Sequence, residues 1–293
     1  GNIVGLPTET VYGLAGNAYS KKSIKKIYKL KRRPKINPLI VHFFNYRDAE
    51  NDVFFNKNFF KLYKKFCPGP ITFILKKKKT SKIHSIVSAN LDTIAIRFPN
   101  HKLIRPVLKK INFPIAMPSA NISSGVSPVT AEHVADEFKK KIKIIINGGN
   151  SKIGIESTVI DLTKKPKILR PGIIDADIIS KVLKSRVKIV KKSSKITSPG
   201  MLKKHYSPGI PIFLNKKSTN KKNAFIILGN KFRNKKNYFN LSQNADLKQA
   251  ASNLYKTLRK IKKLKYRKIY VVKIPNIGPG IAINDRLKRA AKK

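Results

Sequence analysis

Short apolar runs alternate with helix-like segments over the first 177 residues, and this alternation constrains the fold more than any other feature of the sequence. Runs with the length of strands lie at 38–44, 71–75, 93–99, 143–147 and 157–162, and helical patterns lie at 22–31, 102–110 and 130–141. Thr130 is suited to cap the third helix because acidic residues follow it in the first turn. The pattern predicts an α/β sheet, and 293 residues are enough to bury its core.

A change of composition marks a boundary near residue 177. The first 177 residues carry 33 basic and 12 acidic side chains, whereas the remaining 116 carry 32 and 2. A turn-rich segment follows, and after it a strand at 224–228, a helix at 247–264 and a strand at 268–272 form a second, smaller pattern. We therefore predict a catalytic domain at 1–187, a linker at 188–211 and a small parallel α/β domain at 212–293.

The charge balance limits the classes of ligand. The chain has 65 Lys and Arg against 14 Asp and Glu, a formal charge of +51. Such a surface attracts anions, although an AT-rich coding sequence would also enrich lysine. The single cysteine, Cys67, excludes an intrachain disulfide, and no apolar run has the roughly 18 residues that a membrane span needs. These features and the lack of a visible leader predict a cytoplasmic protein without a membrane partner.

Hydroxyls and basic residues gather where the predicted strands begin or end. Thr8 and Thr10 follow the first strand, in a segment that a β-turn with capping hydroxyls would equally explain. Basic residues crowd the end of the helix before the 38–44 strand, which His42 helps to close. A charge run is more often a solvated face, and a lone histidine there is more often a core residue. Local chemistry alone leaves both readings open.

Arg97 lies inside an apolar strand and must be paired with an anion or with several hydrogen-bond acceptors. Because carboxylates are scarce, a bound carboxylate or phosphate is a credible partner. Small polar residues at 118–125, hydroxyls at 154–161 and the isolated Arg170 add further anion-binding groups. The chain lacks the P-loop, G-x-G-x-x-G and H-E-x-x-H motifs, and nothing in it predicts a metal site. The groups present favour a nucleotide pocket that works by positioning and electrostatics.

In their order, these segments resemble the YrdC-like family of threonylcarbamoyl-AMP synthases. The resemblance rests on 7–14, 31–42, 95–97, 118–121, 154–159 and 169–172. The linker segments Ser-Pro-Gly-Met at 198–201 and His-Tyr-Ser-Pro at 205–208, with Ala-Ile-Asn-Asp-Arg-Leu at 282–287, resemble the family's long, two-domain form. The resemblance implies a twisted α/β sheet with a concave basic face, followed by a small Rossmann-like domain.

The resemblance also implies a reaction. L-threonine, bicarbonate or carbon dioxide, and ATP, with Mg²⁺ accompanying the ATP, would give L-threonylcarbamoyladenylate and pyrophosphate. The product would pass to a tRNA threonylcarbamoyl-transferase, which modifies the adenosine beside the anticodon of tRNAs that read codons beginning with A. The basic surface would allow a weak contact with tRNA.

The resemblance assigns roles to residues by position. Threonine would be bound by Thr10, His42, Arg97, Ser119 and Ser157, with Arg97 pairing the carboxylate. ATP would be bound by Lys31, Arg33, Asn37, Thr93, Asn121, Ser127, Arg170, His205 and Tyr206. Lys31 and Arg33 would be catalytic, because they suit the charge that builds at the α-phosphate. His205 and Tyr206 would form a lid over the pocket, and Cys67 would be inert.

The chain departs from the family pattern at several positions. Arg32 and Ala15 stand where glycine is usual, Val129 replaces a threonine, and the loop at 123–125 has an extra serine. None of these touches Arg97 or the segment 119–121. Two alternatives to the synthase are an RNA-binding module without catalysis and a related carbamoyl-transfer domain. Steep salt dependence of RNA affinity would indicate the first, and carbamoyl transfer without threonine the second.

Overall fold

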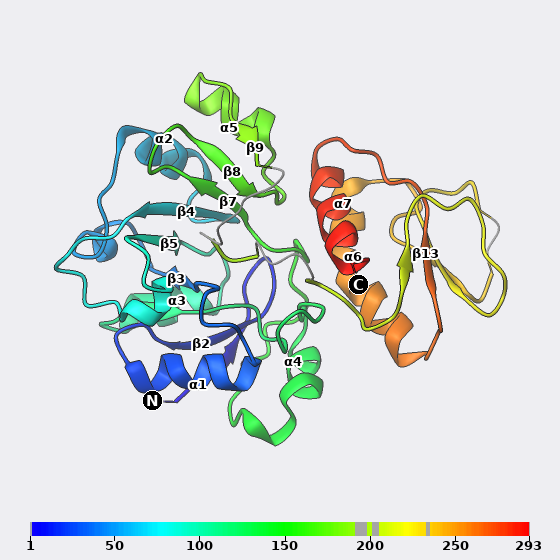
Figure 1. The fold of residues 1–293 in the computed structure, drawn as a ribbon, viewed down its shortest axis with the longest axis horizontal. Helices are drawn as coiled ribbons and strands as arrows, with labels where there is room; N and C mark the ends of the chain where they lie inside the picture. Colours follow the sequence, from blue (N-terminus) through cyan, green and yellow to red (C-terminus); the bar gives the residue numbers. More distant parts are fainter. Residues whose placement is uncertain (1, 191–197, 201–204, 233–234, 293) are drawn as a thin grey trace.

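The computed structural model describes residues 2–190, 198–200, 205–232 and 235–292 and contains two sheets (Figure 1). The helices are α1 (Lys21–Lys31), α2 (Lys57–Phe66), α3 (Ile104–Lys110), α4 (Ala131–Phe138), α5 (Ala176–Leu183), α6 (Leu247–Lys263) and α7 (Pro279–Ala290), with 3₁₀ turns η1 (Arg47–Ala49), η2 (Ser85–Ser88) and η3 (Lys139–Lys141). In the described part of the chain, no helix is both long and apolar enough to cross a bilayer.

The larger sheet has nine strands of mixed direction in the order β1-β2-β6-β3-β5-β4-β7-β8-β9. Its strands are β1 (Val4–Leu6), β2 (Gly13–Asn17), β3 (Ile40–His42), β4 (Ile71–Lys76), β5 (Thr93–Arg97), β6 (Ile115–Ala116), β7 (Thr158–Asp161), β8 (Lys167–Arg170) and β9 (Lys188–Ile189). The strand β3 runs parallel to β5 and places His42 in register with Arg97. These two side chains therefore share the carboxyl end of a parallel strand pair, where α/β sheets bind ligands.

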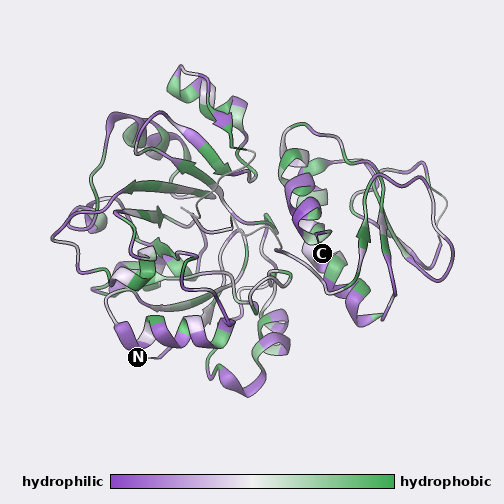
Figure 2. Ribbon diagram, viewed as in Figure 1, coloured by the Kyte–Doolittle hydropathy of each residue, from purple (hydrophilic) through white to green (hydrophobic). Residues whose placement is uncertain are grey.

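The strands of this sheet are largely hydrophobic (Figure 2), and four of them, β3, β4, β5 and β7, arise from the predicted apolar runs. One prediction is wrong. The run 143–147 forms no strand and makes a single bridge between Gly5 and Ile145, with Ile144 and Ile146 exposed. The segment bonds to Gly5 at the edge strand β1 through Ile144 O and Ile146 N, but only Ile145 packs against the core, so the pairing stops after one bridge.

Helix α1 packs its apolar face onto the sheet through Ile24, Ile27 and Tyr28. It begins after Ser20, whose Oγ accepts a hydrogen bond from Ser23 N at 3.3 Å. It ends at Arg32, which has a φ of +50° in the left-handed region. Glycine tolerates that conformation best, which accounts for the glycine of the family pattern, and nothing in the structure explains the arginine that replaces it.

The smaller sheet has four parallel strands in the order β10-β13-β11-β12, so a parallel α/β domain follows the linker as predicted. The strands are β10 (Ile212–Phe213), β11 (Ala224–Ile227), β12 (Tyr238–Asn240) and β13 (Ile269–Val271). Helices α6 and α7 lie between this sheet and the larger domain (Figure 1). We call the part with the nine-stranded sheet, which the sequence analysis predicts to be catalytic, the catalytic domain and the part with the four-stranded sheet the C-terminal domain.

Candidate active site

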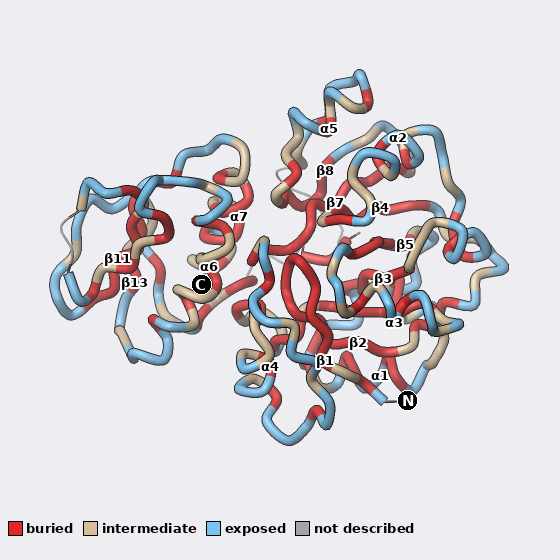
Figure 3. The backbone as a smooth tube through the Cα atoms, turned by 180° about the vertical axis from the view of Figure 1, so that it is seen from behind, coloured by how far each residue is buried: buried red, intermediate tan, exposed pale blue. Residues whose placement is uncertain are grey.

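A buried loop forms one wall of the main cavity. Residues 7–12 connect β1 to β2, and all six are buried (Figure 3). Thr8 Oγ1 holds the loop by donating to Val11 O at 2.6 Å, and it also lies 2.9 Å from Thr10 Oγ1. A loop in which hydroxyls satisfy the backbone can stay buried without regular structure. It therefore presents Thr8 and Thr10 to the cavity in a fixed place.

The cavity encloses about 550 Å³, including its open mouth. Its lining comes from the 7–12 loop, the ends of β3, β5 and β8, the segment after β6 and the linker. Eight residues singled out in the sequence line it: Thr10, Arg33, His42, Arg97, Ser119, Arg170, His205 and Tyr206. Segments far apart in the sequence thus bring both sets of predicted ligands to one cavity.

Arg97 is 4% exposed, and its partner within the chain is Glu9. Arg97 Nη2 lies 2.7 Å from Glu9 Oε1, so the sequence argument that favoured a bound anion missed a carboxylate of the chain itself. Arg97 Nε and Glu9 Oε2 have no hydrogen-bond partner among the described residues. The guanidinium therefore retains unused hydrogen-bonding capacity beside the cavity.

His42 stands next to Arg97 in the sheet and is uncharged at neutral pH. Its burial, followed by the repulsion of Arg97, lowers its pKa to about 3. Its Nδ1 has no hydrogen-bond partner among the described residues. A neutral imidazole can accept or donate a hydrogen bond to a polar ligand without adding charge to the cavity.

Two arginines provide the positive wall of the cavity. Arg33 donates to Asn37 O at 2.9 Å and to Asn37 Oδ1 at 2.6 Å, and burial lowers its pKa to about 10. Arg170 donates to Ser157 O and Ser157 Oγ, both at 3.0 Å. Linker residue Gly200 packs against Arg170 so closely that an added Cβ would lie 3.0 Å from its Cδ. Each guanidinium is therefore held in place before any anion binds.

Six of the predicted ligands do not line the cavity: Lys31, Asn37, Thr93, Asn121, Ser127 and Ser157. Asn37 and Ser157 lie behind it and hold Arg33 and Arg170. Thr93 starts β5 and lies about 13 Å along the strand from Arg97, at its opposite end. The structure thus places some of these residues as supports and Thr93 away from the others.

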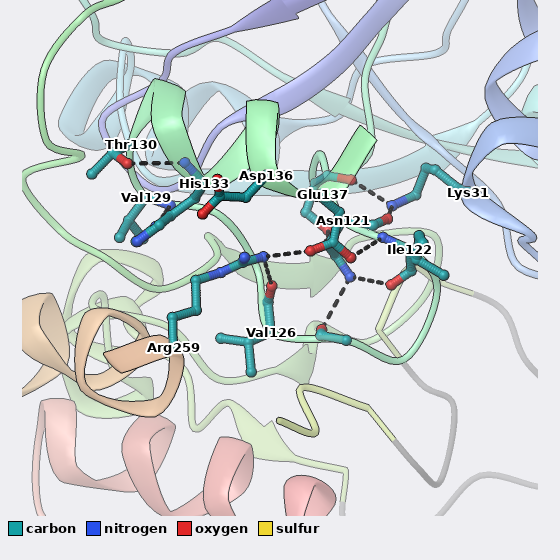
Figure 4. Close-up of polar contacts among 12 residues, drawn as sticks. Lys31, Asn121, Ile122, Val126, Val129, Thr130, His133, Asp136, Glu137 and Arg259 are labelled. Carbon is teal, nitrogen blue, oxygen red and sulfur yellow. Dashed lines mark hydrogen bonds and ion pairs between the residues drawn. The ribbon is translucent and has the colours of Figure 1, made fainter. Parts of the chain in front are cut away.

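Lys31 is buried behind the loop that follows β6. Its Nζ donates to Ser119 O and Asn121 O, while Ser119 Oγ donates to Asn121 Oδ1 at 2.6 Å. Burial, followed by the repulsion of Arg33, holds the pKa of Lys31 well below its usual range. Ile122 N, in the same loop, donates to Glu137 Oε1 of α4 at 2.8 Å (Figure 4). The loop is thus held from both sides.

Glu156 is a cavity residue that the sequence analysis missed. It is buried, and its Oε1 accepts from Ser127 Oγ at 2.6 Å. Its Oε2 accepts from Tyr255 and Arg286 of the C-terminal domain, each at 2.8 Å. Burial raises the pKa of Glu156, but the opposing charges of Arg286 and Arg170 prevail and bring it to about 2. The sequence around Glu156, beside the hydroxyls of Ser157 and Thr158, contains no local pattern that would indicate partners some 100 residues further along the chain.

Both parts of the chain match known protein families. A family model described as "Telomere recombination" (Sua5, YciO, YrdC) matches residues 1–172, and one described as "Threonylcarbamoyl-AMP synthase, C-terminal domain" matches residues 174–292. The threonylcarbamoyl-AMP synthase of Bacillus subtilis is 36% identical, over 99% of this chain and 89% of its own length. That of Pyrococcus abyssi is 33% identical, over 99% and 91%.

Solved structures agree with these similarities. The crystal structure of P. abyssi Sua5 complexed with L-threonine matches with a TM-score of 0.91 at 33% identity, over 99% of this chain and 90% of that one. The crystal structure of E. coli YciO, at 24% identity and a TM-score of 0.54, covers 61% of this chain and 87% of its own, and indicates the fold alone.

Proposed function

The chain belongs to the threonylcarbamoyl-AMP synthase family, and from that membership we propose the reaction of its cavity. L-threonine, ATP and bicarbonate or carbon dioxide combine there to give L-threonylcarbamoyladenylate and pyrophosphate. Two neighbouring ligand sites, one for an amino acid and one for a nucleotide, are what this chemistry requires.

One observation carries the proposal: a single cavity is lined by both Arg97 and Arg170. Their strands, β5 and β8, are three positions apart in the sheet, which corresponds to about 14 Å. That separation allows Arg97 to bind the threonine carboxylate while Arg170 and Arg33 bind phosphate oxygens. An RNA-binding surface has no need of such a buried pair of sites.

Threonine is held by Arg97 through its carboxylate, with Glu9 fixing the guanidinium from behind. Thr10, Ser119 and the neutral His42 offer short polar groups for the amine and hydroxyl of the substrate. Ser157 does not line the cavity. It supports the threonine side through Thr72, whose Oγ1 lies 2.7 Å from Ser157 Oγ. A neutral His42 leaves the positive charge of the threonine side concentrated on Arg97.

The reaction forms two bonds and breaks one linkage of ATP. The threonine amine attacks the carbon of carbon dioxide, or of bicarbonate with loss of its oxygen as water, and gives up a proton to form the carbamate. A carbamate oxygen then attacks the α-phosphorus, the bond to the β-phosphate breaks, and pyrophosphate leaves. Arg33, in the cavity lining, stabilises the charge that develops on the phosphates, and Lys31 supports this step from behind by holding the carbonyls of Ser119 and Asn121.

Further residues act on the nucleotide. Arg170 contacts ATP from the cavity wall, Asn37, Asn121 and Ser127 support the wall from behind, and His205 and Tyr206 cover the nucleotide so that water does not hydrolyse the adenylate. The main chain near Thr93, which was expected to bind ATP, lies at the opposite end of β5 from Arg97 and has no part in this proposal. Among the described residues, no three His, Cys, Asp or Glu side chains are placed to hold a metal ion. Mg²⁺ would therefore enter bound to the phosphates of ATP.

The product leaves for a tRNA threonylcarbamoyl-transferase, and the +51 surface favours a weak contact with tRNA. The reactions that supply ATP and use tRNA set the place of action in the cytoplasm. Transfer to the partner enzyme would remove the adenylate before it hydrolyses.

Pyrophosphate release tests the proposal. We expect release from ATP, Mg²⁺ and bicarbonate to require L-threonine, to disappear in Arg97→Ala and to survive in Arg47→Ala, which removes an exposed arginine of the same domain. Because Arg97→Ala leaves Glu9 buried without its partner, Arg97→Lys serves as the folded variant that keeps the charge but loses the bidentate fork.

Two other outcomes would overturn the proposal. A folded protein that binds ATP but releases no pyrophosphate, with RNA affinity that falls steeply with salt, would indicate an RNA-binding module. Carbamoyl transfer from carbamoyl phosphate without threonine would indicate a related transferase.

A further inference from the structure

Arg286 is the most deeply placed cation of the C-terminal domain. It lies on α7, is 1% exposed, and its Nε donates to Glu156 Oε2 at 2.8 Å. Its Nη1 donates to Asp285 Oδ2 at 2.7 Å, and its Cζ lies 5.0 Å from the centre of the Tyr206 ring. Burying an arginine costs free energy of folding unless partners match its charge. The partners of Arg286 include Glu156 of the other domain and Tyr206 of the linker.

The contact of Arg286 with Glu156 reaches the cavity wall. Glu156 lines the cavity and is followed by Ser157, whose main-chain and side-chain oxygens hold Arg170. Moving Glu156 would move Ser157 with it, and Arg170 would lose both of its acceptors. Arg286 itself is not among the residues that line the cavity, so it can affect ligands through Glu156 but not by touching them.

The contact of Arg286 with Tyr206 reaches the linker. Tyr206 lines the cavity, is 1% exposed, and has a φ of +63°, a conformation that tyrosine rarely adopts. Its ring lies 4.0 Å from that of His205 and stacks at 5.9 Å on that of Tyr255 from α6. Side-chain contacts must hold this backbone in place, and the guanidinium of Arg286 adds a cation–π contact to them.

We propose that Arg286 is a positioning residue for the nucleotide site: it joins Glu156 on the cavity wall to Tyr206 on the linker and so keeps the linker over the phosphates of ATP. The C-terminal domain then has a part in the reaction although none of its described residues lines the cavity. The inference rests on the proposed function for its meaning, but ATP affinity tests it separately.

A different contact keeps the two domains together when Arg286 is altered. Arg259 of α6 donates through Nη2 to Val126 O and lies 3.1 Å from Glu137 Oε2 of α4 (Figure 4). It shares no partner with Arg286. Removing Arg286 should therefore disturb the linker and the wall without separating the domains.

The test compares Arg286→Met and Arg286→Lys with two controls. Lys288→Ala removes an exposed charge from the same helix, and Ile269→Ala weakens the core of the C-terminal domain at β13, on the sheet beyond the helices. ATP affinity is measured by calorimetry without threonine, and KM and kcat are measured by pyrophosphate release. Thermal unfolding of every variant reports the loss of stability.

We expect Arg286→Met to weaken ATP binding about 10-fold and to leave KM for threonine within about twofold of the original protein. Arg286→Lys, which keeps the charge but loses the fork, should recover part of the affinity, and the controls should retain all of it. Glu156→Gln combined with Arg286→Met should weaken ATP binding no more than Arg286→Met alone, because one acts through the other.

Three results would overturn the inference. The first is an unchanged ATP affinity in Arg286→Met, or in Arg286→Lys if the methionine variant does not fold. The second is an equal loss in Ile269→Ala at the same loss of stability, which would show a role in stability alone. The third is a multiplicative loss in the double variant. Failure of threonine-dependent release in the original protein would refute the proposed function and leave the calorimetric test intact.

Discussion

The two domains treat their buried polar groups differently. Around the cavity of the catalytic domain, Asn37 Nδ2, His42 Nδ1 and Arg97 Nε have no hydrogen-bond partner among the described residues. In the C-terminal domain, Thr219 Oγ1, Arg259 Nε and Arg286 Nη2 also lack a partner in the described structure, but none of these residues lines the cavity. Buried groups are normally bonded, so unused capacity that gathers beside the cavity indicates where a ligand would complete the structure.

The contacts between the domains follow the same distinction. Arg286 and Tyr255 of the C-terminal domain direct their polar atoms to Glu156, and Arg259 directs its own to Glu137. Polar side-chain atoms of the C-terminal domain thus bond to the catalytic domain. Some polar side-chain atoms of the catalytic domain, in contrast, remain available to a substrate. Substitutions in the first domain should therefore change the chemistry, and those in the second should change affinity and stability.

The largest effect is expected from Lys31→Met. Loss of the ammonium that holds Ser119 O and Asn121 O should displace Ser119 in the cavity wall and lower kcat about 100-fold, the effect that a misplacement of about 1 Å can produce. Single-turnover release of pyrophosphate measures this step. Lys29→Met, on the exposed side of the same helix, makes the same change of charge and should keep the original rate. A folded Lys31→Met variant with normal kcat would remove the basis for assigning the chemistry to this domain.

A second prediction concerns the pH dependence of stability. Glu156 is ionised in the folded protein down to a pKa of about 2, because Arg286 and Arg170 outweigh the effect of its burial. The unfolded chain binds its proton near pH 4.5, so this contribution is complete above that pH and is lost as the pH falls towards 2. The difference amounts to about 3 kcal/mol.

Urea unfolding at pH 7, 5, 4 and 3 checks this. Glu156→Gln should be less stable than the original protein at pH 7, and its free energy of unfolding should fall less steeply between pH 5 and 3. If the free energy of unfolding falls equally steeply with pH in the two proteins, the effect does not come from the Glu156 carboxyl. The prediction also tests the comparison between the domains, because the pKa of Glu156 in the catalytic domain depends in part on Arg286 of the C-terminal domain.

Sequence patterns predicted the local features well. Thr130 caps α4 as predicted, its Oγ1 accepting from His133 N at 3.2 Å, because a cap depends on residues three positions apart. The apolar runs at 38–44 and 93–99 became β3 and β5. Their parallel pairing, which brings His42 beside Arg97, depends on contacts that no short pattern records.

The site shows the same limit. Thr10, Arg97 and Arg170 were singled out by their places beside predicted strands, whereas Asn37 and most other ligands were assigned from the family resemblance. Glu9 and Glu156 were missed as partners of Arg97 and Arg286, which lie 88 and 130 residues further along the chain. Lys31 was expected at the phosphates, but the fold buries it behind the carbonyls of Ser119 and Asn121. Chain topology decides such pairings.

The next smaller effect is expected from Arg259→Met. Its ion pair with Glu137 is partly buried, with side-chain exposures of 12% and 18%, and it also donates to Val126 O. We expect a loss of about 1 to 3 kcal/mol in stability, typical of hydrogen bonds to charged groups. Hydrogen exchange should increase in the 121–126 loop, and Arg267→Met, an exposed arginine of the same domain, should leave it unchanged. Equal exchange in both variants would separate this loop from the C-terminal domain.

The smallest effect is expected from Lys263→Ala, at the edge of the same contact between α6 and α4. Lys263 Nζ lies 2.8 Å from Asp136 Oδ2, a shorter distance than that of the Arg259 pair, but the two side chains are 71% and 48% exposed. Because water and salt screen exposed charges, removal should cost less than about 0.5 kcal/mol in low salt. The cost should fall further in 0.5 M salt, where the Debye length is about 4 Å instead of the roughly 30 Å of dilute buffer. A loss as large as that of Arg259→Met would mean that charge and proximity, and not burial, join the domains.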